Sequence, residues 1–198
     1  MKNTLDKEIV DRILQNDKSA FIDLINRYKN KGFSLSMKIL KNKEDAEEAL
    51  QDSFIRVFNA LNNFNWNSSF STWFYRIVFN VCYSRTQAGS EKFYKLGSSI
   101  SDMEEGGVDS IGSNKMTPDT ILINSEIEKI VNEEIEKLPP HYSIVLDLFL
   151  LQEQSYEEIV SITGINMGTV KAQISRARII LRNNVANRLE LNSLANIY

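Results

Sequence analysis

Apolar residues recur three and four positions apart along most of the chain, which is the spacing of an amphipathic helix. Ile9 and Ile13 keep this spacing near the start, and a second series runs from residue 21 to residue 28. A third series comprises Ala46, Leu50, Phe54, Val57 and Leu61. No segment alternates apolar and polar residues convincingly enough to predict a strand. We therefore expect an all-α protein, with Asp17 and Asn42 placed to cap two of its helices.

The segment from residue 155 to residue 181 predicts a helix-turn-helix. Ser155 and Glu158 have the spacing of a capping box, and Gly164 stands where a helix must stop and turn. Asn166 is a good N-cap for a second helix. The inward stripe of that helix would be Val170, Ile174, Ala177 and Leu181. This pattern of caps and turn is typical of DNA-binding proteins.

The opposite face of the second helix is polar and basic. It carries Lys171, Ala172, Ser175 and Arg176, flanked by Arg178 and Arg182. No acidic residue occurs between Ser161 and Leu189. A one-sided basic helix matches the negative charge of DNA phosphates. A solvated basic helix packed on an acidic one is the alternative.

The composition fits an intracellular protein with a substantial core. The chain has 198 residues, of which 42% are hydrophobic, and a net charge of −3. The small net charge hides an internal asymmetry, because several glutamates between residues 126 and 136 precede the basic helix. A single cysteine, Cys82, excludes an internal disulfide. We expect a cytoplasmic location without membrane insertion, because the chain shows neither a signal segment nor an apolar run of about 18 residues.

A stretch rich in glycine, serine and acidic residues lies between about Ser98 and Asp119. Such a segment cannot bury enough apolar surface to fold alone. It predicts a flexible acidic linker over residues 96–122. We expect a first helical domain over residues 1–95, a second over 123–190, and a tail over 191–198.

A polar loop with interleaved aromatic residues follows the third apolar series, from Asn62 to Ser71. Amides and hydroxyls can hydrogen-bond the edges of an unpaired base, and aromatic faces can stack on it at about 1–3 kcal/mol per base. The loop is therefore a candidate receptor for a base taken out of the duplex. Phe64 and Phe70 could instead be core residues, and we expect that of one of them.

Two blocks of the sequence resemble extracytoplasmic-function (ECF) sigma factors, the small initiation subunits of bacterial RNA polymerase. The Leu138-Pro139-Pro140-His141-Tyr142 segment, the apolar run that follows, and the helix-turn-helix resemble the fourth conserved region of that family. The segment from Asp45 to Phe54, and that from Ser71 to Ile77 with Asn80, resemble the second conserved region. The two blocks together cover most of the chain in the right order.

The resemblance implies partners and roles for particular residues. The partners are promoter DNA and core RNA polymerase, through the clamp helices of its largest subunit and the flap of its second-largest subunit, with a further anti-sigma factor or DNA-bound recruiter. The upstream promoter element would contact Thr169, Lys171, Ala172, Ser175, Arg176 and Arg178. The downstream element and melted strand would contact Phe64, Asn65, Asn67, Ser68, Ser71, Trp73, Phe74, Arg76 and Asn80. Polymerase would contact Glu48, Gln51 and Asp52, although a solvated face is an equal alternative for these groups.

The chain departs from this family after Ser84. Members usually carry a cluster of arginines here, whereas only Arg85 and Lys92 remain, opposed by Glu91. Each missing phosphate contact removes a counterion-release contribution to affinity. We therefore expect weak duplex binding at this end and dependence on a separate recruiter.

Other classes of function fit less of the sequence. An enzyme is not expected, because His141 is the only histidine, Cys82 lies in an apolar helical context, and no phosphate-binding glycine loop accompanies the acidic residues. No catalytic residue, metal site or cofactor is predicted. A homodimeric helix-turn-helix regulator would explain only residues 125 to 190. A decoy that occupies polymerase without reading promoters is a third alternative.

Overall fold

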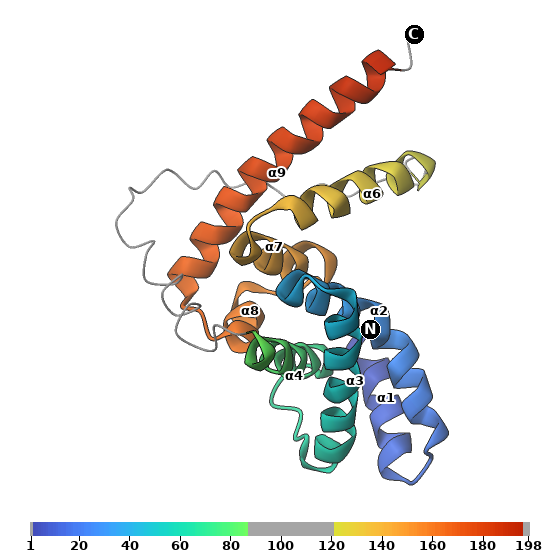
Figure 1. Cartoon of the computed structure of the whole chain (residues 1–198). Helices are drawn as coiled ribbons and strands as arrows, with labels where there is room; N and C mark the ends of the chain where they lie inside the picture. Colours follow the sequence, from blue (N-terminus) through green and yellow to red (C-terminus); the bar gives the residue numbers. More distant parts are fainter. Residues whose placement is uncertain (1, 87–120, 196–198) are drawn as a thin grey trace.

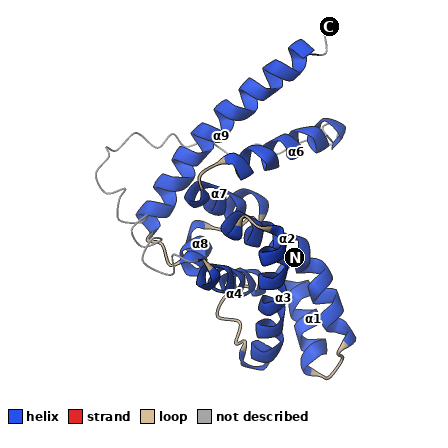
Figure 2. Ribbon diagram, in the orientation of Figure 1, coloured by secondary structure: helices blue, strands red, loops and turns tan. Residues whose placement is uncertain are grey.

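The chain is helical, as the computed structural model shows for residues 2–86 and 121–195 (Figure 1, Figure 2). Within these two ranges every regular element is a helix, which confirms the all-α expectation. The helices form an N-terminal bundle over residues 2–86 and a C-terminal bundle over residues 121–195. Most of the expected acidic linker, residues 96–122, lies outside the described residues, and the expected domain boundaries stay a prediction.

The N-terminal bundle contains four α-helices and one short 3-10 turn. These are α1 (Lys2–Leu14), α2 (Ser19–Leu40), α3 (Lys43–Ala60), η1 (Leu61–Asn63) and α4 (Phe70–Arg85). Asn42 caps α3 by accepting the backbone N–H of Asp45 at 2.9 Å, as predicted. A side-chain cap of this kind stabilises a helix by about 1 kcal/mol. The prediction that Asp17 caps α2 is wrong, because Lys18 is at the N-cap position and makes no side-chain cap hydrogen bond. Asp17 lies one residue earlier and accepts the backbone N–H of Ser19 at 3.1 Å.

Close packing of α2 against α3 and α4 depends on Gly32. A Cβ atom at this position would lie 2.6 Å from Leu50 Cδ1 and 2.9 Å from Phe74 Cζ. The aromatic core lies beside this contact, where Tyr28 meets Phe70 and Phe74 with ring centroids 5.2 and 5.0 Å apart. Replacing a buried aromatic of this kind by alanine costs about 3–5 kcal/mol. These packed rings hold the start of α4, and the loop before it, in a fixed position.

The C-terminal bundle comprises α6 (Ile121–Lys137), α7 (Pro140–Leu146), a π-helical turn η3 (Asp147–Leu151), α8 (Tyr156–Thr163) and α9 (Met167–Ala195). Its own core joins α6, α7 and α9 through Ile135, Leu138, Leu146, Ala177 and Leu181. Helix α9 continues well beyond the helix-turn-helix and runs alongside α6 (Figure 1). Arg188 of α9 pairs there with Glu133 and Glu134 of α6. Two glutamates of the acidic segment thus pair with one arginine of the basic helix.

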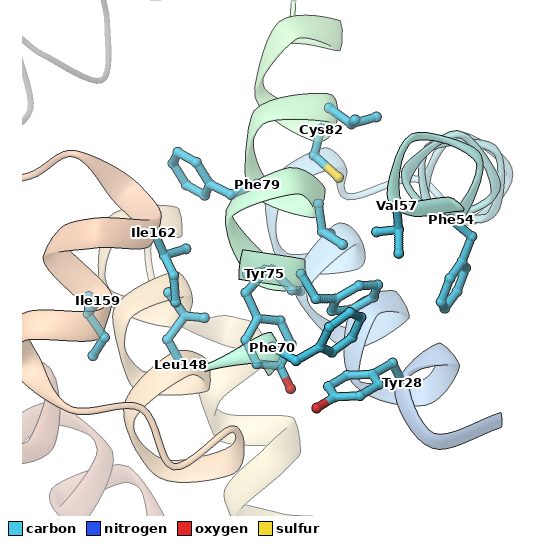
Figure 3. Close-up of a cluster of buried hydrophobic side chains, with 14 of the residues drawn as sticks. Tyr28, Phe54, Val57, Phe70, Tyr75, Phe79, Cys82, Leu148, Ile159 and Ile162 are labelled. Carbon is cyan, nitrogen blue, oxygen red and sulfur yellow. The ribbon is translucent and has the colours of Figure 1, made fainter. Parts of the chain in front are cut away.

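The two bundles share one hydrophobic core. Leu148, Ile159 and Ile162 of the C-terminal bundle belong to the same buried cluster as Tyr75 and Phe79 of α4 (Figure 3). Helix α8 packs on α4, and α7 packs on α2. The expectation of two bundles is confirmed, but the sequence did not reveal that they pack directly on each other.

Candidate nucleic-acid and polymerase interface

The helix-turn-helix has the local geometry that its sequence predicts. Ser155 accepts the backbone N–H of Glu158 at 3.2 Å, and Glu158 Oε2 accepts that of Ser155 at 2.8 Å. Gly164 ends α8 in the left-handed conformation with φ 74°. Asn166 accepts the backbone N–H of Thr169 at 2.8 Å at the start of α9. The predicted inward stripe of α9 is buried at all of its positions, namely Val170, Ile174, Ala177 and Leu181.

The outer face of α9 presents most of the predicted contacts to the upstream element. Lys171, Ser175 and Arg178 are exposed, and Ala172 and Arg176 are half-buried. Thr169 differs, because it is buried at the beginning of the helix. Its position favours a role in fixing the turn over a base contact.

A cation–π contact fixes the end of this basic face. The Arg178 guanidinium lies 5.4 Å from the ring centroid of Phe149. The Phe149 ring stacks in turn on Tyr156 of α8, with centroids 5.2 Å apart and an angle of 7° between the planes. Such a contact contributes about 0.5–1 kcal/mol at an exposed site. Arg178 is therefore ordered by its own protein and still exposed.

Two aromatic rings of the polar loop and one from the first turn of α4 pack against one another. Phe64 stacks on Trp73 with centroids 4.7 Å apart and planes 26° from parallel, and Trp66 lies 4.7 Å from Phe64. All three rings are only partly buried. Trp66 has a positive φ of 58°, which is uncommon for an aromatic residue. Backbone strain of this kind occurs preferentially at functional sites.

The same loop carries the polar side chains that were predicted to contact an unpaired base. Asn65 and Asn67 are exposed, and Ser68 and Ser71 are half-buried. Asn65 Oδ1 accepts the backbone N–H of Asn67 at 3.3 Å, which shapes the loop. Amide and hydroxyl groups close in sequence to partly exposed aromatic rings suit recognition of an unstacked base.

Two aromatic residues of the same segment have a packing role instead. Phe70 and Phe74 are both fully buried, and their rings lie 6.4 Å apart in the core. We therefore retain Phe64 and Trp73 as candidate base contacts and assign Phe74 to the core. Arg76 and Asn80 of α4 are exposed, and their contact with a DNA strand stays a prediction.

The polar residues predicted to meet polymerase lie on the outer face of α3. Glu48 and Gln51 are exposed, and Asp52 is half-buried. An apolar groove between α2 and α3 adjoins Gln51 and contains Phe21, Ile25, Phe54, Ile55 and Phe58. Ile55 and Phe58 are 59% and 46% exposed, which is unusual for large apolar side chains that serve no partner.

Arg85, at the end of α4, pairs with acidic side chains of α3. Its guanidinium pairs with Asp52, and with Glu48 at 3.2 Å, so that the end of α4 is joined to α3. The two carboxylates hold the pKa of Arg85 above its usual value, against the opposing effect of desolvation. Sequence reasoning missed this contact because the partners are 33 positions or more apart.

Groups that could support catalysis are sparse in the described part of the chain. No cluster of three metal-binding side chains occurs within residues 2–86 and 121–195. Cys82 is buried, and burial raises the pKa of its thiol. Burial also lowers the pKa of His141. Among the same described residues, no helix is long and apolar enough to cross a membrane.

Comparison with known proteins assigns the class. Residues 24–90 match the family described as Sigma-70 region 2, and residues 129–181 match Sigma-70, region 4. The chain is 32% identical to the ECF RNA polymerase sigma factor SigW of Bacillus subtilis, with 89% of this chain and 94% of that protein covered. It is also 32% identical to the ECF RNA polymerase sigma-E factor of Haemophilus influenzae, with 91% and 95% covered. The chain belongs to the ECF RNA polymerase sigma factors.

Two solved structures share the fold. CnrH in complex with the cytosolic domain of CnrY superposes with a TM-score of 0.58, over 92% of this chain and 97% of that one, at 18% identity. The sigma factor RpoE of Bartonella quintana, in complex with the anti-sigma factor NepR, superposes with a TM-score of 0.56, over 84% and 96%, also at 18% identity.

Proposed function

We propose that this protein binds core RNA polymerase, recognises a promoter at two elements and helps to melt the DNA between them. The observation that carries the proposal is the presence, in one chain, of a capped basic helix-turn-helix and an open aromatic stack edged with amides and hydroxyls. The first suits duplex DNA and the second suits unpaired bases. A homodimeric helix-turn-helix regulator would leave the second without a role.

The upstream element is read by the outer face of α9. Lys171 and Arg176 lie nearest the start of the helix, where a recognition helix approaches base edges. Arg178 lies two residues after Arg176 and is held by Phe149, which suits a contact to phosphate. Ala172 and Ser175 lie between Lys171 and Arg176 in the sequence of this helix, and only Ser175 of the two can hydrogen-bond a base or phosphate. This assignment rests on exposure and helical position.

The downstream element is bound by the loop before α4. An extruded base stacks against the Phe64 and Trp73 pair, and Asn65, Asn67, Ser68 and Ser71 hydrogen-bond its edges. Arg76 and Asn80 follow the strand backbone along α4. Extrusion of a base costs a few kcal/mol, and one good stack offsets most of this cost.

Polymerase binds the outer face of α3. Glu48, Gln51 and Asp52 supply the polar contacts, and the neighbouring groove with Ile55 and Phe58 supplies apolar area. Such a surface, with an apolar centre and a charged edge, is typical of protein interfaces. The C-terminal bundle provides a second contact, to the polymerase flap. The protein works in the cytoplasm, where polymerase is found, and has no catalytic activity of its own.

Regulation comes from other proteins that bind the chain or the DNA. One of the solved structures with this fold is a sigma factor in complex with an anti-sigma factor, which supports an anti-sigma factor for this chain. The low number of basic residues after Ser84 supports dependence on a DNA-bound recruiter as well. Arg85 strengthens this second point, because the structure shows it neutralised by Asp52 and Glu48.

Reconstituted transcription tests the proposal. The purified chain is added to bacterial core RNA polymerase and a library of promoter fragments, and transcripts are sequenced. We expect initiation from a defined subset that core polymerase alone does not use. A chain that binds polymerase but gives no promoter-specific transcript would be a decoy, and one that binds DNA but not polymerase would be an independent regulator.

A further inference from the structure

The π-helical turn η3 and both helices of the helix-turn-helix contribute to one stack of side chains. Phe149 comes from η3, Tyr156 from the first turn of α8, and Arg178 from α9. The two rings have centroids 5.2 Å apart and planes 7° from parallel. The Arg178 guanidinium carbon lies 5.4 Å from the centroid of the Phe149 ring. We call these three residues the arginine stack.

The backbone that carries the two rings is fixed by hydrogen bonds. The Gln152 N–H donates to the Asp147 carbonyl at 2.9 Å and closes the π-helical turn, an element that occurs often at functional sites. The Asp147 carboxylate is fully buried and accepts from the Ser34 hydroxyl at 2.7 Å. Tyr156 follows directly on the N-cap of α8. The two rings therefore have set places, and the long arginine side chain is the member that they order.

Arg178 keeps its charge available for an outside partner. It makes no ion pair with any residue of the described ranges, whereas Arg85 and Arg188 are both paired with carboxylates. Arg178 is also exposed. A guanidinium stacks on a ring through its face, while its N–H donors lie in its plane and match two oxygens of a phosphate. Stacking therefore orders the guanidinium without using its donors.

We propose that Phe149 is a positioning residue for DNA binding, whose ring, supported by Tyr156, holds the Arg178 guanidinium in place for a phosphate of the upstream element. This inference rests on the proposed function and adds to DNA binding a residue that lies outside α9. An arginine loses conformational entropy when it binds, and one that is already held loses less. Because a phosphate contact carries no base information, Phe149 contributes equally at every upstream sequence.

Phe149→Leu is the informative variant, because it removes the aromatic face and keeps an apolar side chain at a half-buried position. It should weaken promoter binding by the chain with bacterial core RNA polymerase about two- to fivefold, which is the usual strength of an exposed cation–π contact. The salt dependence should stay that of wild type, since Arg178 still reaches the phosphate. Phe149→Tyr keeps a ring and should restore wild-type affinity. Fluorescence anisotropy of a labelled promoter duplex over a salt series measures both quantities.

Arg178→Ala separates positioning from a general effect on the fold. This variant should lower the slope of log K against log salt by about 0.9. Adding Phe149→Leu to it should cause no further loss of affinity, because the group that Phe149 holds is already gone. Arg182→Ala is the matched control, at an exposed position of the same helix. On that background Phe149→Leu should still cause its two- to fivefold loss. Thermal unfolding of each free variant checks that the fold is kept.

Relaxation of the Arg178 Nε–H group, measured by nuclear magnetic resonance in the free full-length chain, reports the ordering directly. We expect a more ordered group in wild type and Phe149→Tyr than in Phe149→Leu. Equal order in all three chains would overturn the proposal. So would an unchanged affinity of Phe149→Leu, or a loss that persists in full beside Arg178→Ala. If the wild-type complex with polymerase binds no promoter, the proposed function fails, while the spectra of the free chains still decide whether Phe149 holds Arg178.

Discussion

Arg85 at the end of α4 pairs with Asp52 of α3, and this contact joins the proposed DNA-facing helix to the proposed polymerase-facing helix. Arg85 is 26% exposed and Asp52 is 44% exposed, so the pair lies near the surface and contributes at most about 1 kcal/mol to stability. The pair matters for DNA binding, because the guanidinium of Arg85, the last arginine of α4, is already paired with a carboxylate of its own protein.

The first prediction tests whether Arg85 contacts DNA. Arg85→Gln should leave the salt dependence of duplex binding nearly unchanged, because the guanidinium is neutralised by two carboxylates and releases few counterions. A free phosphate contact would instead lower the slope of log K against log salt by about 0.9. Fluorescence anisotropy with a labelled duplex over a salt series measures the slope. Arg76→Gln is the control, since Arg76 is exposed on the same helix.

The second prediction concerns reading of the upstream element. If Lys171 or Arg176 binds a guanine bidentately, replacement by alanine should cost about 1–3 kcal/mol and relax the preference at one base position. Binding selections from a randomised duplex pool show which positions relax. An equal loss for all sequences would mark the residue as a phosphate contact. Lys129→Ala, at an exposed position of α6, controls for general charge.

The third prediction concerns melting. Trp73→Ala removes one ring of the stack with Phe64, so it should abolish open-complex formation on duplex promoters and spare a pre-melted template. Potassium permanganate footprinting detects the unpaired thymines. Trp73→Phe should recover part of the activity, because it keeps an aromatic face. Wild-type activity of Trp73→Ala on both templates would remove the residue from the melting step.

Local features of this fold could be read from the sequence, whereas contacts between distant segments could not. The caps at Asn42, Ser155 and Asn166 depend on residues at most three positions apart, and all three are present. The pairing of Lys38 with Asp147 depends on two segments that meet only in the folded protein. Nothing in the sequence around either residue marks it as buried, since isolated charged residues are usually exposed.

The candidate site shows the same division. Trp73 and Phe74 are neighbours with similar side chains, and the sequence favours both as base contacts. The structure separates them, because consecutive residues of a helix point about 100° apart, so that Phe74 enters the core against Tyr28 while Trp73 lies beside Phe64. Helical periodicity shows that the two residues lie on different parts of the helix surface, but it does not show which part the loop covers.

The fourth prediction concerns acid stability. Asp17 accepts hydrogen bonds from Ser19 and pairs with Arg12, and these contacts, with that of Ser19 the largest, lower its pKa to about 2. Because the folded pKa is below the unfolded value of about 3.9, the stabilisation is complete above pH 4 and is lost as the pH falls toward 2. The difference in urea midpoint between wild type and Asp17→Ala should therefore shrink between pH 5 and pH 2.5. Parallel pH profiles would contradict a role for this carboxylate.

The last prediction follows from the few basic residues after Ser84. Gln87, Ala88 and Ser90 lie outside the described residues, within five positions after Arg85, which is paired with Asp52 and Glu48. A holoenzyme with so few phosphate contacts at this helix should initiate weakly unless a DNA-bound recruiter or a closely matched upstream element holds it at the promoter. Replacing Gln87, Ala88 and Ser90 by arginine should raise transcription without a recruiter, and should steepen its salt dependence by up to about 0.9 log units per added contact. Transcription in vitro by core polymerase with wild-type or substituted protein, over a salt series, measures both effects. Replacement of the same residues by glutamine separates the effect of charge from that of length. Strong initiation by the wild type on ordinary promoters, unchanged by the arginines, would show that phosphate contacts at this helix do not limit the protein.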